Sequence, residues 1–161
     1  MAPTVNGVRH LKVWVSDLGR SREWYERVFG AERVLSFEDA DGVVRGMAFK
    51  LPGEPFELAL RENPELAKAL YDADPFALAT SRQDLDAWIA HLEGLGIWHS
   101  PVIQASRGWA MGFRDPDGMQ IRLYADDESV AAGTGDRVVT RETPAAWQAP
   151  PRSDAAETAG Q

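Results

Sequence analysis

The stretch "GFRDPDGMQIRLY", Gly112–Tyr124, contains the signals for a strand, a tight turn and a second strand. At its centre, Asp117-Gly118 is a residue pair that favours a β-hairpin turn, because glycine readily takes the positive φ that such turns require. Side chains alternate between the two faces of a strand, so Gln120, Arg122 and Tyr124 share one face of the second strand. The stretch therefore predicts a hairpin that presents an arginine in the middle of one face.

The N-terminal half predicts a β-α-β-β-β module. "VRHLKVWV" alternates with a period of two, and "SDLGRSREWYERVFG" has helical spacing, with Ser16 or Asp17 as the cap and Gly30 at its end. Asp41-Gly42 is a second hairpin signal. The predicted strands are Val8–Val15, "ERVLSFED", "VVRGMAFKL" and "PFELALR" (Pro55–Arg61).

The C-terminal half repeats this order. The segment "ENPELAKALYDAD" is a polar connection with one or two helical turns, after which "PFALAT" predicts a strand and "SRQDLDAWIAHLEGLG" a helix. "IWHSPVIQAS", "GWAMGFRD" and "MQIRLYA" are the remaining strands. We expect an α+β fold of two βαβββ modules, at about 8–61 and 75–125, that form a cupped mixed sheet. Residues 126–161 are expected to be a tail, mostly disordered or docked on the surface, with Trp147 of unassigned role.

Composition narrows the classes of function. The chain has 161 residues, a formal charge of −8 and no cysteine. The missing cysteines exclude disulfides, thiolate catalysis and zinc–thiolate sites. The acidic balance and the lack of a basic stripe argue against nucleic-acid binding. The N-terminus has no signal-peptide pattern and no stretch has the length of a membrane span, so a soluble cytoplasmic protein without membrane association is expected.

The two βαβββ modules, with "HLKVWVSDLGRSREWYERVFG" in the first and "GFRDPDGMQIRLY" in the second, resemble the vicinal oxygen chelate superfamily. That group includes glyoxalase I, bleomycin-resistance proteins, extradiol dioxygenases, methylmalonyl-CoA epimerase and fosfomycin-resistance enzymes. The resemblance covers Val8 to about Ala125. It implies a U-shaped cup made by a pair of modules, but the fold alone does not fix a chemistry.

In metal-using members of this group, ligands come from the first and last strands of each module. The resemblance places His10 and Glu57 at the first two ligand positions. Asp74-Pro75 stands where a histidine is usual, and Arg122 stands where a glutamate is usual. Two donors are fewer than a divalent ion normally needs, and a permanently cationic arginine repels the ion. We therefore expect no metal cofactor; a divalent ion held by His10 and Glu57, with His91, His99 or Asp74 as further ligands, is the alternative.

Arg122 has two interpretations. It replaces the metal electrostatically by pairing with Glu57, with His10 alongside, or it faces solvent or forms a structural salt bridge. Strand parity puts Lys12 and Trp14 on the face of His10, and Ala59 and Arg61 on that of Glu57. The predicted ligand-binding residues are His10, Trp14, Glu57, Trp98, Trp109, Gln120, Arg122 and Tyr124.

Three functions remain open. The first is a metal-independent binding protein of the bleomycin-resistance type, which holds an aromatic or cationic drug or metabolite in an aromatic cup. The second is a glyoxalase-like metal-dependent lyase, isomerase or dioxygenase that uses His10 and Glu57. The third is a metal-free enzyme with Glu57 or His10 as general base. A homodimer is expected, because one pair of modules leaves an exposed sheet edge.

Overall fold

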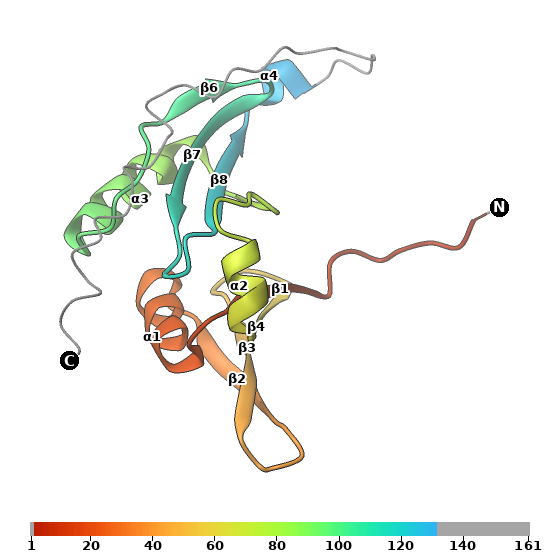
Figure 1. Ribbon diagram of the computed structural model, residues 1–161. Coiled ribbons are helices and arrows are strands. Elements are labelled where there is room, and N and C mark those ends of the chain that lie inside the picture. The colour runs from red at the N-terminus through yellow and green to blue at the C-terminus, as the bar shows by residue number, and fades with distance from the viewer. Residues whose placement is uncertain (1, 132–161) are drawn as a thin grey trace. The chain divides into compact units, whose positions relative to one another are not determined.

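The computed structural model describes residues 2–131 and confirms the α+β class, with two four-stranded mixed sheets and helices beside them (Figure 1). Side chains are described up to Ser129. Most of the predicted tail, including Trp147, lies outside the described residues. The elements in chain order are β1 His10–Val15, α1 Leu18–Phe29, β2 Glu32–Glu38, β3 Val44–Lys50, β4 Glu57–Glu62, α2 Pro64–Ala69, β5 Ala77–Ala79, α3 Arg82–Gly94, β6 Ile103–Ala105, β7 Gly108–Arg114, β8 Gln120–Asp126 and α4 Glu128–Ala131.

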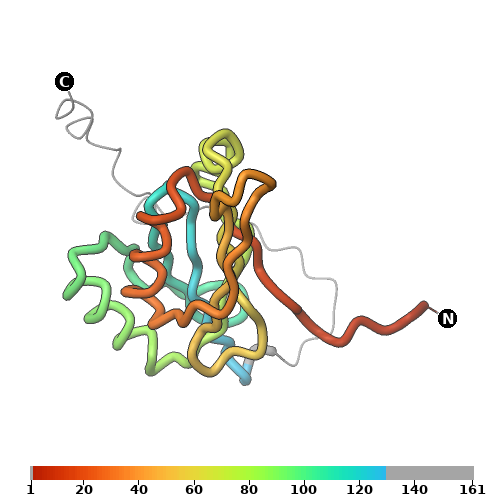
Figure 2. The backbone as a smooth tube through the Cα atoms, turned by 90° about the horizontal axis from the view of Figure 1, so that it is seen from below, coloured from red at the N-terminus to blue at the C-terminus, as the bar shows by residue number. Residues whose placement is uncertain are grey.

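The first sheet has the strand order β1-β4-β3-β2, with β1 and β4 parallel and the other pairs antiparallel. Gly42, in the predicted hairpin turn between β2 and β3, has a φ of 77°, as this turn requires. Before β1, the N-terminal segment ahead of Arg9 extends away from the strands (Figure 2). The edge strand β2 is exposed along its whole length.

Helix α1 begins and ends where the sequence predicts. The Asp17 carboxylate accepts a hydrogen bond from the Arg20 N–H at 2.8 Å, which caps the helix, and Gly30 ends it with a φ of 61°. Its buried side chains include Tyr25 and Val28, and the helix contacts β4. One face of the first sheet is therefore apolar and buried; it includes Val13, Val15, Phe49, Leu58 and Leu60.

The second sheet has the order β5-β8-β7-β6, with β5 and β8 parallel. The predicted strand at 75–80 is reduced to Ala77–Ala79, which fits the lack of a backbone N–H at Pro75. Likewise, only Ile103–Ala105 of the predicted 97–106 strand pairs continuously, while His99 forms an isolated bridge to Phe113. The last strand runs to Asp126, one residue past the predicted module boundary, and α4 follows within the predicted tail.

Two compact units divide the chain. Among the described residues, the first comprises 2–75 together with 114–121, and the second comprises 76–113 with 122–131. The β7–β8 turn thus belongs to the first unit although it comes from the second module. Asp117 in this turn accepts hydrogen bonds from both the backbone N–H and the hydroxyl of Ser16, and from Arg20 at 2.7 Å. These bonds hold the turn at the N-terminus of α1.

No helix among the described residues is long and apolar enough to cross a membrane.

Candidate functional site

The strand register of the first sheet defines an open face, opposite the buried apolar one. Paired residues on neighbouring strands share a face, so each row of partners crosses the sheet. Three rows belong to the open face: His10, Glu57, Lys50 and Glu32; Lys12, Ala59, Ala48 and Leu35; and Trp14, Arg61, Gly46 and Phe37. The parity predicted for β1 and β4 agrees with this register.

Arg61 is the central side chain of the third row. The position that a Cβ on Gly46 would take overlaps Arg61 Nη1 and lies 2.9 Å from Arg61 Cδ and Cζ, so the guanidinium lies directly over the glycine backbone. Its Cζ is 3.8 Å from the centre of the Phe37 ring. Nη1 is buried and makes no hydrogen bond within residues 2–131. Gly46 thus provides the space in which Arg61 lies flat against the sheet.

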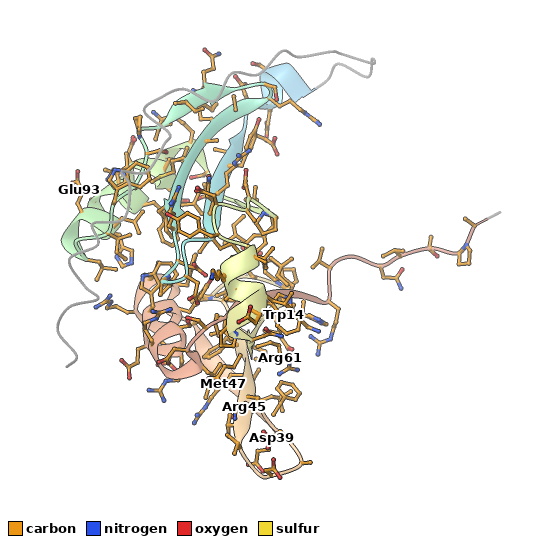
Figure 3. The ribbon with its side chains drawn as sticks, in the orientation of Figure 1. Trp14, Asp39, Arg45, Met47, Arg61 and Glu93 are labelled. Atoms are coloured by element: carbon orange, nitrogen blue, oxygen red, sulfur yellow. The ribbon has the colours of Figure 1, made fainter. Side chains whose placement is uncertain are left out.

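Trp14 occupies the β1 end of the same row. It is the register partner of Arg61 and is part-exposed, and the two residues are labelled in Figure 3. The ammonium of Lys12, one position back on the same face, lies 5.7 Å from the centre of the Trp14 ring. The open face therefore holds two aromatic rings, each with a cation against it.

His10 and Glu57 are also register partners, at the other end of the open face. Arg9 Nη1 lies 2.9 Å from Glu57 Oε2, and the Glu57 side chain is 20 % exposed. His10 is exposed. Sequence reasoning missed the pair with Arg9, because the predicted strand Val8–Val15 puts Arg9 on the face opposite His10, whereas β1 begins only at His10. The predicted pairing of Glu57 with Arg122 stays a prediction.

The described residues do not fit a divalent metal ion. Within residues 2–131, no three histidine or acidic side chains lie close enough together to hold one. Glu57, one of the two donors that the sequence supplies, is already paired with an arginine. In the second sheet, the register partner of Arg122 is Ala77, which has no ligating atom, and Asp74 precedes that strand. Residues 2–131 therefore do not bring together the three or four donors that are usual for such a site.

In the second unit, Arg122 and Tyr124 lie on one face of β8, with Ala77 and Ala79 as partners on β5. Both are part-exposed, whereas the intervening Leu123 is buried. The Tyr124 hydroxyl accepts a hydrogen bond from the Arg107 N–H at 3.0 Å. Gln120, at the start of β8, belongs to the first unit. Its side-chain amide nitrogen donates a hydrogen bond to the backbone oxygen of Asp72 at 3.3 Å.

Trp109, predicted to bind ligand, lies on the face of the second sheet opposite Arg122. It shares strand parity on β7 with Phe113, whose ring stacks on Trp88 of α3 with the centroids 6.2 Å apart. The guanidinium of Arg82, the first residue of α3, lies 5.9 Å from the Trp109 ring. Trp109 therefore packs toward α3.

The β7–β8 hairpin keeps one unshifted register from end to end. Backbone hydrogen bonds at its two ends show this, one from Asp127 N to Arg107 O and one from Asp115 N to Met119 O. That register pairs Arg122 with Gly112, so Arg122 lies on the face away from Trp109.

Trp98 lies after α3 and is 38 % exposed. His91, on α3, has its ring 5.6 Å from that of Trp88.

Asp115, in the β7–β8 turn, is a buried carboxylate in the first unit. Burial raises its pKa to about 6, and the nearby Asp117 carboxylate adds to this rise. Backbone N–H groups of Asp117 and Met119 donate to its Oδ1, at 3.0 and 2.9 Å, and the Tyr25 hydroxyl donates to Oδ2 at 3.2 Å. The pKa of Tyr25 is raised by its own burial and by Asp115. These contacts fix the turn, in agreement with the structural role that its sequence predicts.

Arg61, Gly46 and Phe37 are the site features that the predicted residue set lacks. Parity alone places Arg61 on the face of Glu57. Gly46 and Phe37 require the cross-strand register, which the Asp41-Gly42 turn constrains only approximately, because the β2–β3 ladder contains two register irregularities.

Sequence comparison decides the family. The sequence profile of the Glyoxalase/Bleomycin resistance protein/Dioxygenase superfamily matches residues 7–123. The chain belongs to this superfamily. Among curated proteins, none has a sequence that matches this chain.

Several solved structures share the fold. A glyoxylase/bleomycin resistance protein/dioxygenase domain from Frankia sp. EAN1pec is 23 % identical, covering 77 % of this chain and 100 % of its own, with a TM-score of 0.64. TnmS3, an antibiotic binding protein from Streptomyces sp. CB03234, is 23 % identical over 78 % and 100 %, with a TM-score of 0.65. FosX, a fosfomycin resistance protein from Listeria monocytogenes, is 18 % identical over 78 % and 96 %, with a TM-score of 0.62.

Proposed function

We propose that this protein binds a small planar molecule, a drug or a metabolite, on the open face of its first sheet without a metal ion. The observation that carries the proposal is the row formed by Trp14, Arg61 and Phe37 over Gly46. A part-exposed ring, an exposed ring and a flat guanidinium lie in one row across the sheet. Such a surface recognises planar ligands by stacking and by directed hydrogen bonds.

The donor set supports binding without a metal. His10 and Glu57 are neighbours, but Glu57 is held by Arg9 and the superfamily's usual glutamate is replaced by Arg122. Elemental analysis of protein purified without chelator and then incubated with nickel, zinc, iron and manganese tests this point. We expect less than one divalent ion per ten chains; one ion per chain would overturn the metal-free reading.

The antibiotic binding protein TnmS3 supports a binding role, since a protein of this fold serves that purpose. A role in antibiotic resistance by sequestration is the corresponding proposal for this chain. The exposed edge strand β2, with Leu35 and Phe37 at 52 % and 39 % exposure, supports the accompanying proposal that two copies pair as a homodimer. Light scattering on purified protein measures the dimer directly.

Titration calorimetry with 2-naphthamide, a neutral planar probe, tests the binding site. Replacing Trp14 by alanine should weaken binding by about 1–3 kcal/mol, because the ring supplies the stacking surface. Leu66→Ala is the matched control, since Leu66 is 41 % exposed but lies on α2. If the parent and the Trp14 variant bound the probe with equal affinity, the open face would not be the binding site.

A second candidate function is proton transfer by His10 or Glu57, favoured by their pairing across β1 and β4. A bound carbonyl compound with an acidic neighbouring proton would be the substrate. Proton exchange into deuterated water, followed by NMR, distinguishes this function from binding. Exchange that is abolished in His10→Gln and survives a chelator would establish metal-free catalysis.

A further inference from the structure

We infer that the ligand of the open face is a planar anion, such as an aromatic carboxylate, and that Arg61 is the residue that selects it. The inference rests on the proposed function, because it names the chemical class of the molecule bound there. The sequence alone suggests an aromatic or cationic ligand, and the inference replaces the positive charge of that ligand with a negative one.

The distribution of charge on the open face carries the first step. The rows of Lys12 and Trp14 contain two cations, Lys12 and Arg61, and no carboxylate. The other members of these rows are apolar or glycine. The acidic side chains of the face belong to the row of His10, and of these Glu57 is neutralised by Arg9 at 2.9 Å. Although the chain has a net charge of −8, this part of the face is positive.

The aromatic rings carry the second step. A cationic ligand would bind over the negative face of a ring, but both rings of the row already have a protein cation near them. Lys12 Nζ is 5.7 Å from the Trp14 ring centre, and Arg61 Cζ is 3.8 Å from that of Phe37. A ligand cation would have to displace these groups or be repelled by them, whereas an anion would be attracted to both.

The hydrogen-bonding state of Arg61 carries the third step. Nη1 is buried and makes no hydrogen bond within the described part of the chain, and no ion pair there joins Arg61 to a carboxylate. The other guanidinium N–H groups also make no hydrogen bond within residues 2–131, and a ligand carboxylate would satisfy them with charge-assisted bonds while Nη1 stays against the sheet. The flat position over Gly46 orients the guanidinium before the ligand arrives, so Gly46 acts as a positioning residue.

Three probes with the same ring system test the inference by titration calorimetry at pH 7: 2-naphthoate, neutral 2-naphthamide and cationic 2-naphthylmethylamine. We expect naphthoate to bind roughly ten- to a hundred-fold more tightly than the amine, with the amide between them. In Arg61→Gln the naphthoate affinity should fall by the same factor while the amide affinity changes less than about three-fold. Lys68→Gln, on α2, controls for the change in net charge.

Gly46→Ala tests positioning without removing the charge. The new methyl group would displace the flexible end of Arg61, and the backbone of Gly46 needs no positive φ, so the variant should fold. Its preference for naphthoate over the amine should shrink to less than about one third of the parental ratio. Gly94→Ala, where a Cβ meets nothing within 4 Å, is the matched control and should keep the full preference.

The outcomes separate the two proposals. Binding of the amide that depends on Trp14, with no preference between naphthoate and the amine, would overturn the anion inference and leave the proposed function standing. A preference for the amine, or a naphthoate affinity that Arg61→Gln does not change, would also overturn the inference. Failure of all three probes to bind would overturn both.

Discussion

In the first unit, β1 runs for six residues and presents His10, Lys12 and Trp14 on its open face, whereas β5 of the second unit runs for three and presents alanines at 77 and 79. Both units place an arginine across from a glycine on the neighbouring strand, Arg61 from Gly46 and Arg122 from Gly112. In the first, a large ring, Phe37, lies against the guanidinium from the next strand. One topology therefore places large polar and aromatic side chains on the first strand of one copy and alanines on the corresponding strand of the other.

The largest effect is expected from breaking the contact between the β7–β8 turn and α1. Asp117 is 8 % exposed and accepts three hydrogen bonds, from the backbone N–H and hydroxyl of Ser16 and from Arg20. Asp117→Ala should lower the free energy of unfolding by about 3–4 kcal/mol, because three hydrogen bonds are lost and the part-buried donors of Ser16 are left unpaired. Urea denaturation measures the change.

Asp86→Ala provides the control for that substitution. Asp86 forms an exposed ion pair with Arg82 on α3, so its loss should cost less than about 0.5 kcal/mol. If the Asp117 variant were no less stable than the Asp86 variant, the first unit would not depend on the turn that the second module supplies.

A pH-dependent effect is expected from the neighbouring Asp115, whose pKa is raised to about 6 by burial. Between about pH 4 and 6, folded Asp115 keeps a proton that the unfolded chain has released, so its contribution to stability is lost as the pH rises through this window. A shift of about two units corresponds to about 3 kcal/mol. Tyr25, Asp117 and Arg20 are the other ionisable groups near it.

Asp115→Asn should remove this dependence while keeping an oxygen for the two backbone donors. The free energy of unfolding of the variant minus that of the parent should rise by about 2–3 kcal/mol as the pH goes from 4 to 7. Urea denaturation at each pH measures this difference. Asp126→Asn, at the exposed end of β8, should show no such trend. A pH-independent difference for Asp115→Asn would mean that Asp115 is ionised throughout this range.

Two tryptophan substitutions sharpen the contrast between the sheets. Trp14→Ala should weaken naphthoate binding by about 1–3 kcal/mol with little change in stability, because Trp14 is on the open face. Trp109→Ala should lower stability by about 1–2 kcal/mol and leave binding unchanged, because Trp109 packs toward α3 near Arg82. Calorimetry and thermal unfolding of both variants separate these effects. The reverse result would exchange the roles of the two sheets.

The order of elements and the ends of α1 were predictable because their signals are local: strand alternation, the Asp17 cap, the Gly30 stop and the Asp-Gly turns. The open-face placement of Trp14 and Arg61 was likewise predictable from parity. The orientation of Trp109 was not, since both faces of β7 are buried and the sequence does not show which of them packs toward α3. Phe37 escaped prediction because its position over Gly46 depends on a ladder with irregular register.

The smallest effect is expected from freeing Glu57. Arg9 is 72 % exposed, so Arg9→Ala should change stability by less than about 0.5 kcal/mol. The released carboxylate should make the open face less positive and raise the affinity for 2-naphthylmethylamine by about two- to five-fold, with a matching fall for 2-naphthoate. Arg27→Ala, on the exposed last turn of α1, removes the same charge away from the sheet and should alter neither affinity. Equal changes in affinity in both variants would mean that net charge, rather than the neutralisation of Glu57 by Arg9, sets the preference between the two probes. The difference between the two sheets would then lie in Arg61 and its aromatic neighbours alone.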